Sequence, residues 1–249
     1  AVGGLVGRQH NGSVSNATAG GPVEASGADV GGLIGRAQHA TVNTSDATGA
    51  VVGGGSAVGG LIGAMHEGNI TDVRATGDVE GRTDAVGGLI GVNDGDLTRA
   101  HAEGSVTGVG DRVGGLVGAH RHGAAVASTA AGTVFGAADQ VGGLIGNASG
   151  GTLTDVTARG SITALGGSVG GLIGANAAAL TGATAVADVE GTSAVGGLVG
   201  ANRGPITDSR AAGRVDGSGA RIGGLVGANA ASLSDVRAAG AVTGAEDVG

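Results

Sequence analysis

The chain has 249 residues, 59 of them Gly, and contains no Cys, Trp or Tyr, so disulfides, thiolate sites and an aromatic core are excluded. Its formal net charge is −8, all 13 basic residues are Arg, and no run of like charge exceeds two residues. A nucleic-acid-binding patch is therefore not expected. No apolar stretch approaches the roughly 18 residues of a membrane span, and no signal peptide is recognisable.

One hexapeptide, Val-Gly-Gly-Leu-(Ile/Val)-Gly, recurs along the chain at intervals of 26 to 28 residues. Copies begin at Val2, Val30, Val58, Val86, Val113, Val141, Val169, Val195 and Ile222, and a tenth begins at Val248. A fixed period of this size indicates stacked units, each of which buries its apolar face against its neighbours. We therefore expect one continuous repeat array over residues 1–249, incomplete at both ends.

The copy that begins at Val58 shows the predicted elements of one unit in chain order. A short strand over 58–63 precedes a turn over 64–69, and from Ile70 to Glu80 small apolar residues then alternate with polar ones. Period-two alternation is typical of a half-buried strand, and residues 81–85 turn the chain back. No unit carries a helical period. The sequence predicts an all-β fold, a parallel β-solenoid of nine 26–28-residue coils with a thin Val/Ile/Leu/Ala/Gly core, right-handed by default.

The second and third apolar anchors of a coil are nine residues apart in eight copies, and the copy with Val126 and Val134 is one residue short. Some glycines are expected to supply positive φ at the corners of each coil. Others, such as Gly77 and Gly104, are expected to face inward and let two sheets approach closely.

The Leu of the hexapeptide leaves two alternatives, because Leu and the next residue are neighbours and a straight strand cannot bury both. Either the Gly-Gly pair kinks the chain and Leu is buried, or Leu faces outward. In the second case an apolar association stripe would form from Leu5, Leu33, Leu61, Leu89, Leu116, Leu144, Leu172, Leu198 and Leu225.

The segments that follow the hexapeptide carry a family resemblance. Residues 68–72 and 204–208 read Gly-x-Ile-Thr-Asp, and residues 75–81 and 211–217 read Ala-x-Gly-x-Val-x-Gly. With the hexapeptide, these segments resemble the GLUG repeat along the whole chain. The resemblance implies solenoid repeats of bacterial and archaeal surface proteins, including haemagglutinin-like adhesins and some surface peptidases, where the repeats form stalk or passenger segments. It implies no catalytic residues.

Several side-chain patterns are candidate sites. Histidines follow the first strand of some coils and could bind a metal: His10, His39, His66, His120 and His122. Carboxylates share a column beside arginines, as in acid–base sites or as in a solvated charge ladder: Asp72, Asp155, Asp208 and Asp235 beside Arg74, Arg210 and Arg237. Residues 92–96 resemble a calcium loop without its downstream Glu. We interpret these residues as polar turns, and expect no catalytic residue, cofactor or metal.

Two further columns and a set of sequons complete the pattern. A hydroxyl column, interrupted at Asn43 and Ala127, could template ice or simply satisfy a corner: Ser15, Thr71, Thr98, Thr154, Thr181, Thr207 and Ser234. A partial amide ladder is expected from Asn93, Asn176, Asn202 and Asn229. Asn-x-Ser/Thr sequons, candidate N-glycosylation sites in a secreted protein, begin at Asn11, Asn16, Asn43, Asn69 and Asn147.

The sequence thus favours a non-catalytic extracellular structural protein, a rigid stalk or fibre segment at the cell surface that acts in adhesion. The alternatives are a self-assembling filament subunit that stacks end to end through uncapped solenoid edges, and a binding module for ice, glycan or metal on one face. The expected partners are the chain itself or other surface proteins. Nucleic acid, a direct membrane span and a small-molecule substrate are not expected.

Overall fold

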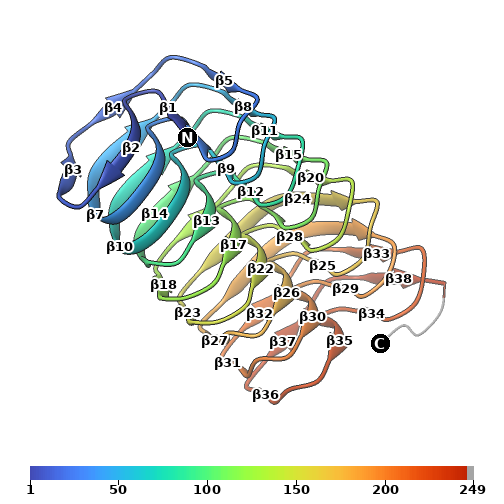
Figure 1. The fold of residues 1–249 in the computed structure, drawn as a ribbon. Helices are drawn as coiled ribbons and strands as arrows, with labels where there is room; N and C mark the ends of the chain where they lie inside the picture. Colours follow the sequence, from blue (N-terminus) through green and yellow to red (C-terminus); the bar gives the residue numbers. More distant parts are fainter. Residues whose placement is uncertain (246–249) are drawn as a thin grey trace.

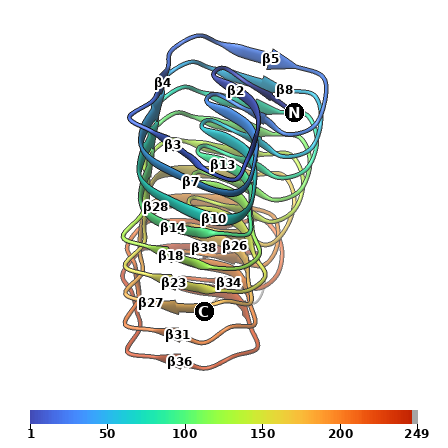
Figure 2. The ribbon, with the colours of Figure 1, turned by 60° about the vertical axis from the view of Figure 1, so that its left-hand side comes forward.

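The computed structural model describes residues 1–245, so the hexapeptide copy at Val248 lies outside the described residues. Within this range every secondary-structure element is a β-strand. The chain winds into coils stacked along one axis, with its N-terminal coil at one end and its last coil at the other (Figures 1 and 2). Equivalent residues of successive coils, such as Val30 and Val58, pair in parallel. The predicted parallel β-solenoid is confirmed, and its handedness stays a prediction.

Each coil contributes up to five strands, and equivalent strands form columns along the stack. The first column holds β1 (Val2–Gly3), β6 (Val30–Gly31), β9 (Val58–Gly59), β12 (Val86–Gly87), β16 (Val113–Gly114), β21 (Val141–Gly142), β25 (Val169–Gly170), β29 (Val195–Gly196) and β34 (Ile222–Gly223). The second holds β2 (Val6–His10), β7 (Ile34–Ala47), β10 (Ile62–Ala75), β13 (Ile90–Asn93), β17 (Val117–His120), β22 (Ile145–Ala148), β26 (Ile173–Asn176), β30 (Val199–Asn202) and β35 (Val226–Asn229).

The remaining columns complete each coil. The third holds β3 (Ser13–Ser15), β14 (Asp96–Ala102), β18 (Ala124–Val126), β23 (Thr152–Thr154), β27 (Ala179–Thr181), β31 (Ile206–Thr207) and β36 (Leu233–Ser234). The fourth holds β4 (Thr18–Ala19), β19 (Thr129–Ala130), β24 (Thr157–Ala164), β28 (Thr184–Gly191), β32 (Arg210–Ala211) and β37 (Arg237–Ala238). The fifth holds β5 (Val23–Ala25), β8 (Val51–Gly53), β11 (Val79–Gly81), β15 (Val106–Gly108), β20 (Val134–Gly136), β33 (Val215–Gly217) and β38 (Val242–Gly244).

A bend in the hexapeptide decides where its Leu lies. In the second coil, Gly32 and Leu33 form a bend between β6 and β7. Leu33 and Ile34 therefore enter one core cluster while Val30 enters another. The kinked, buried alternative is confirmed, and the exposed association stripe is wrong, because seven of its leucines are fully buried: Leu33, Leu61, Leu89, Leu116, Leu144, Leu172 and Leu198. Leu5 in the first coil is 53% exposed, and Leu225 in the last is partly buried.

Some glycines supply positive φ as expected, such as Gly68 and Gly123, but most positive-φ residues in residues 1–245 are not glycine. The residue before each hexapeptide from the second copy on has φ between 48° and 64°: Asp29, Ala57, Ala85, Arg112, Gln140, Ser168, Ala194 and Arg221. Such a residue is strained by about 1–2 kcal/mol. It persists because the neighbouring coils hold the backbone on both sides.

Glycine is favoured instead where backbones approach closely. A Cβ on Gly104 would overlap the carbonyl oxygen of Gly77 in the preceding coil, and a Cβ on Gly77 would overlap that of Gly49. The expectation for Gly77 and Gly104 is therefore wrong about the neighbour, which is the preceding coil and not the opposite sheet. The close approach across the core belongs to the second Gly of the hexapeptide: a Cβ on Gly60 would lie 3.1 Å from the Cβ of Ala75.

Two local predictions are corrected by the register. Residues 64–69 are not a separate turn, because β10 continues through them around a corner at Glu67 and Gly68, whose φ values are 55° and 126°. Leu97 of the fourth coil pairs with Ala125 of the fifth, which is buried. Thr98 pairs with Val126, which is half-buried. The inward anchor is thus Ala125, and the nine-residue spacing to Val134 is kept in this coil too.

Candidate functional site

Charged side chains gather along a shallow groove of about 250 Å³ that crosses coils two to five. Its floor is a small apolar cluster that includes Ala57, Ala85 and Val92. The corner residues before the hexapeptides form one wall, and outward-facing residues of the second strand column form the other. The charged groups that line it are Asp29, Arg36, His66, Arg112 and Arg121.

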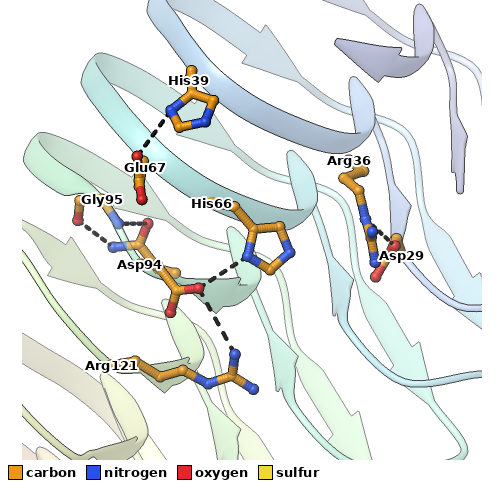
Figure 3. Close-up of polar contacts among 9 residues, drawn as sticks. Asp29, Arg36, His39, His66, Glu67, Asp94, Gly95 and Arg121 are labelled. Atoms are coloured by element: carbon orange, nitrogen blue, oxygen red, sulfur yellow. Dashed lines mark hydrogen bonds and ion pairs between the residues drawn. The ribbon is translucent and has the colours of Figure 1, made fainter. Parts of the chain in front are cut away.

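The charges in this groove are arranged as pairs between neighbouring residues (Figure 3). Asp94 Oδ2 lies 2.9 Å from His66 Nδ1 in the coil before it and 3.8 Å from the Arg121 guanidinium in the coil after it. At the other end, Arg36 Nε donates to Asp29 Oδ2 at 2.6 Å. Because each cation faces a carboxylate, the groove has little net charge, and no carboxylate is positioned as an isolated acid or base.

The five histidines considered as metal ligands do not converge. The rings of His10 and His39 meet edge to face at 6.1 Å, and His39 Nδ1 also lies 2.9 Å from Glu67 Oε2. His66 contacts Asp94, His120 is buried in the core, and His122 is exposed. Across residues 1–245, no three His, Asp or Glu side chains are grouped so that they could hold a metal ion.

Amide side chains, buried at Asn176 and Asn202 and exposed at Asn229, form the ladder expected from the sequence, although over fewer residues. Asn176 Nδ2 donates to Asn202 Oδ1 at 2.9 Å, and Asn202 Nδ2 donates to Asn229 Oδ1 at 2.8 Å. Each side chain also bonds the backbone two residues on; Asn176 Nδ2, for example, donates to the Ala178 carbonyl. The ladder therefore satisfies the corner and ties adjacent coils together, which is a structural role.

Asn93 stands in the same column, but its neighbour in the next coil is His120. Asn93 Nδ2 donates to His120 Nδ1 at 3.1 Å, and Asn93 Oδ1 accepts from the Gly95 amide. These contacts place the ring proton on Nε2, which is buried and has no hydrogen-bond partner within residues 1–245. Burial lowers the pKa of His120, since a charged ring in the core would lose its hydration.

The predicted column of carboxylates and arginines does not form a continuous charge ladder. Within residues 1–245 only Asp72 and Arg74 of this set form ion pairs, and their partners are Arg99 and Glu103. Asp72 accepts two hydrogen bonds from Arg99, at 2.6 and 2.8 Å, and Arg74 donates to Glu103 at 2.6 and 3.0 Å. The Arg99 hydrogen bonds lower the pKa of Asp72, and those of Arg74 lower the pKa of Glu103. All four groups are solvated, so they stay ionised and contribute little to stability.

The hydroxyl column aligns as expected except in the fifth coil, where Val126, and not Ala127, stands between Thr98 and Thr154. A second set of hydroxyl side chains was not predicted from the sequence. These side chains point into the core, at a repeat position where other coils carry Val or Ala. Ser45, Ser128 and Ser209 are buried there. Ser128 Oγ donates to the Val126 carbonyl at 2.9 Å and accepts from the Ala100 amide of the preceding coil at 3.1 Å. Ser45 and Ser209 make equivalent contacts.

Acidic turn residues bind the backbone of the next coil, a role not predicted from the sequence. Asp84 Oδ1 accepts from the Asp111 amide at 3.1 Å, Asp111 Oδ1 accepts from Asp139 at 3.0 Å, and Asp139 Oδ1 accepts from Gly167 at 2.7 Å. Each carboxylate thus binds a backbone amide of the next coil. A recurring Asp at one repeat position was the signal for this contact.

The sequon asparagines lie at different depths. Asn11, Asn16 and Asn69 are exposed, whereas Asn43 and Asn147 are half-buried. The Asn147 amide nitrogen donates to Gln140 Oε1 at 2.9 Å. Their glycosylation stays a prediction.

The comparisons with known proteins agree with the repeat architecture. The family model described as the GLUG motif matches residues 1–23, 54–80 and 137–163. Neither a curated protein nor a solved structure matches the chain. Within residues 1–245, no helix has the length and apolar character needed to cross a membrane. The chain therefore contains GLUG-motif repeats at three places, and the hexapeptide that begins these repeats also begins the other coils.

Proposed function

We propose that this chain is a non-catalytic structural element, a rigid stalk or fibre segment of an extracellular or cell-surface protein that acts in adhesion. The observation that carries the proposal is the unbroken register of the coils. From Val2 to Ile222, the first residue of each hexapeptide pairs with its equivalent in the next copy. Several of the ion pairs described above, such as Arg99 with Asp72 and Arg74 with Glu103, link neighbouring coils, as expected of a spacer.

The same contacts support stiffness. Backbone bonds such as Leu33 N to Leu61 O, at 2.9 Å, recur at each step of the stack. Amide, serine and aspartate contacts add side-chain links between the same coils. A coil that tilted away from its neighbour would break several of these bonds at once, at about 1 kcal/mol for each bond.

A distance measurement tests the stiffness directly. Glu24 and Thr243 are exposed and stand in one strand column, eight steps apart. The chain has no Cys, so Glu24→Cys and Thr243→Cys can carry spin labels at these two positions alone. At about 4.8 Å per coil we expect one narrow distance distribution near roughly 38 Å, widened only by the label linkers. A broad distribution would contradict a rigid spacer.

The surface location and adhesive role require experiments in cells. Antibody against this chain should label intact cells of the source organism without permeabilisation, and deleting the repeat array should weaken attachment to surfaces or to neighbouring cells. Labelling only after permeabilisation would contradict the proposed location. Unchanged attachment after deletion would contradict the adhesive role.

End-to-end self-association is a second candidate, because each coil already binds the backbone of its neighbouring coil in parallel register. Sedimentation of the purified chain over a concentration series, followed by electron microscopy, tests this candidate. Filaments with one coil per roughly 4.8 Å would support stacking, and single rods at every concentration would exclude it.

A further inference from the structure

One patch of large exposed apolar residues lies on the outer surface of the fifth strand column, which is mostly polar. Val109 is 56% exposed, Phe135 38% and Leu165 62%. Phe135 is the only aromatic residue of the chain and lies on β20, between Thr107 and Thr163 of the adjacent coils. The strands β8, β11, β15 and β20 that carry this column follow one another along the stack (Figure 1).

The coil of Phe135 lies between the coils that carry Val109 and Leu165. Val109 directly follows β15, and Leu165 directly follows the last residue of β24. Leu165 N bonds the Gly136 carbonyl, and Val109 N bonds the Gly81 carbonyl, so both residues continue the strand register. Leu165 therefore lies one coil and two residues from Phe135, a diagonal of about 7–8 Å that large side chains can span.

The composition of the column indicates that the patch is not needed for the fold. At the position of Phe135, seven of the other eight coils carry Glu, Asp or Thr, and the second coil carries the half-buried Val52. At the position of Leu165 and Val109, other coils carry Arg82, Ala137 and Ser218. Most coils thus have the same backbone without a large exposed apolar side chain at these positions. The three large apolar residues therefore call for an explanation outside the packing of the solenoid.

Carboxylates flank the patch on two sides. Asp111 and Asp139 lie in the turns that follow Val109 and β20. On the other side, a groove of about 360 Å³ is lined by Leu165 together with Glu190 and Asp216. Asp216 is paired with Arg214 at 2.8 Å, whereas Glu190, Asp111 and Asp139 have no ion-pair partner in residues 1–245. The surroundings of the patch are therefore negatively charged.

We propose that Val109, Phe135 and Leu165 form a docking site for a protein segment that presents a large apolar side chain next to Lys or Arg. The apolar group packs against Phe135 and Leu165, and the cation is attracted by Glu190 and the two turn aspartates. A second copy of the same patch is a poor occupant, because two acidic borders would repel each other. An anionic lipid surface is disfavoured for the same reason. This site goes beyond the spacer role and does not depend on it.

The test uses three short synthetic peptides and the ¹⁵N-labelled chain. One peptide alternates Leu with Lys, the second alternates Leu with Glu, and the third alternates Ser with Lys. We expect the Leu/Lys peptide to shift the amide resonances of β15, β20, β24 and the turn after Leu165, and to bind more weakly as salt is raised. The two control peptides should bind at least about tenfold more weakly, which corresponds to 1.4 kcal/mol.

Consensus-like substitutions provide matched variants. The triple variant Val109→Ser, Phe135→Thr, Leu165→Thr uses residue types found in the same strand column, or in the turn after it, in other coils. It should lower the affinity for the Leu/Lys peptide about tenfold or more. Glu190→Gln should weaken binding and reduce its salt dependence. Val186→Thr removes an apolar residue that is 45% exposed on a different column, and should leave binding unchanged.

Several outcomes would overturn the proposal. These are resonance shifts spread over other coils, equal binding by the triple variant, and equal binding of the Leu/Glu peptide. Sedimentation with anionic vesicles that is lost in the triple variant would assign the patch to lipid instead. The spin-label distance between coils one and nine should be unchanged in the triple variant. A failure of the docking site is therefore distinguishable from a failure of the rigid spacer.

Discussion

Replacing Gly104 by Ala adds one methyl group where two coils are in backbone contact. The new Cβ would overlap the carbonyl oxygen of Gly77 and lie 2.5 Å from its carbonyl carbon. Neither atom belongs to a flexible side chain, so the overlap is relieved only if the third and fourth coils separate locally. Two backbone bonds oppose that separation: Glu103 N to Ala75 O at 3.0 Å, and Val79 N to Ser105 O at 2.9 Å.

The magnitude follows from these two contributions. Overpacking of a tight site costs about 1–3 kcal/mol. Stretching one of the backbone bonds beyond hydrogen-bond length removes about 1 kcal/mol more. We therefore expect Gly104→Ala to lower the free energy of unfolding by about 3 kcal/mol.

The assay combines urea denaturation with native-state hydrogen exchange, because a repeat array need not unfold in a single step. Amides of the third and fourth coils should lose protection, whereas those of the seventh and eighth should keep it. Ala187→Gly is the matched control, since Ala187 already stands in this glycine column and pairs with Gly160. That change should alter stability by at most about 1 kcal/mol. A Gly104→Ala variant as stable as the parent chain, or a loss of protection confined to distant coils, would refute the reasoning.

Three further predictions concern polar contacts. Because burial lowers the pKa of His120 below its ordinary 6.5, the unfolded chain binds a proton that the folded chain excludes, so the free energy of unfolding should fall as pH drops below 6.5. Urea titrations at several pH values should show a smaller fall for His120→Asn, and an equal fall would contradict this assignment. Ser128→Ala leaves the buried Ala100 amide without its acceptor and should lower stability by about 1–2 kcal/mol in the same assay, whereas an unchanged midpoint would show that water replaces the hydroxyl. Arg99→Ala removes the exposed bond to Asp72 and should leave the thermal midpoint unchanged at physiological salt.

The repeat period and the alternation of small apolar residues were sufficient to predict the stacked coils, because both are local and recur in every copy. The position of Leu33 was left open, since it depends on a bend whose direction the residue types do not specify. Contacts between coils were harder still. The neighbour of Gly104 and the inward direction of Ala125 follow from the register of one coil on the next. That register depends on contacts between coils, so the sequence of one coil alone does not determine it.

Among the site residues, too, contacts between identical recurring residues were predictable, and contacts between different residue types were not. The amide ladder from Asn176 to Asn229 was predictable because identical residues recur at one position. The bond between Asn93 and His120 was not, because two different residue types meet in that column. Ser128 was missed because other coils place apolar residues in its column, so its polarity resembled surface variation.

The left-handed corner residues have a consequence for how the molecule is assembled. Residues 1–245 contain 19 non-glycine residues with positive φ, among them Ala57, Ala85 and Arg112. In a free chain, the left-handed conformation would cost about 1–2 kcal/mol at each such residue. A coil already in place changes the balance, because its carbonyls and amides bind the incoming strand only when the corner is left-handed. Each finished coil is therefore a template that selects the shape of the next, and a single coil in isolation has no template to follow.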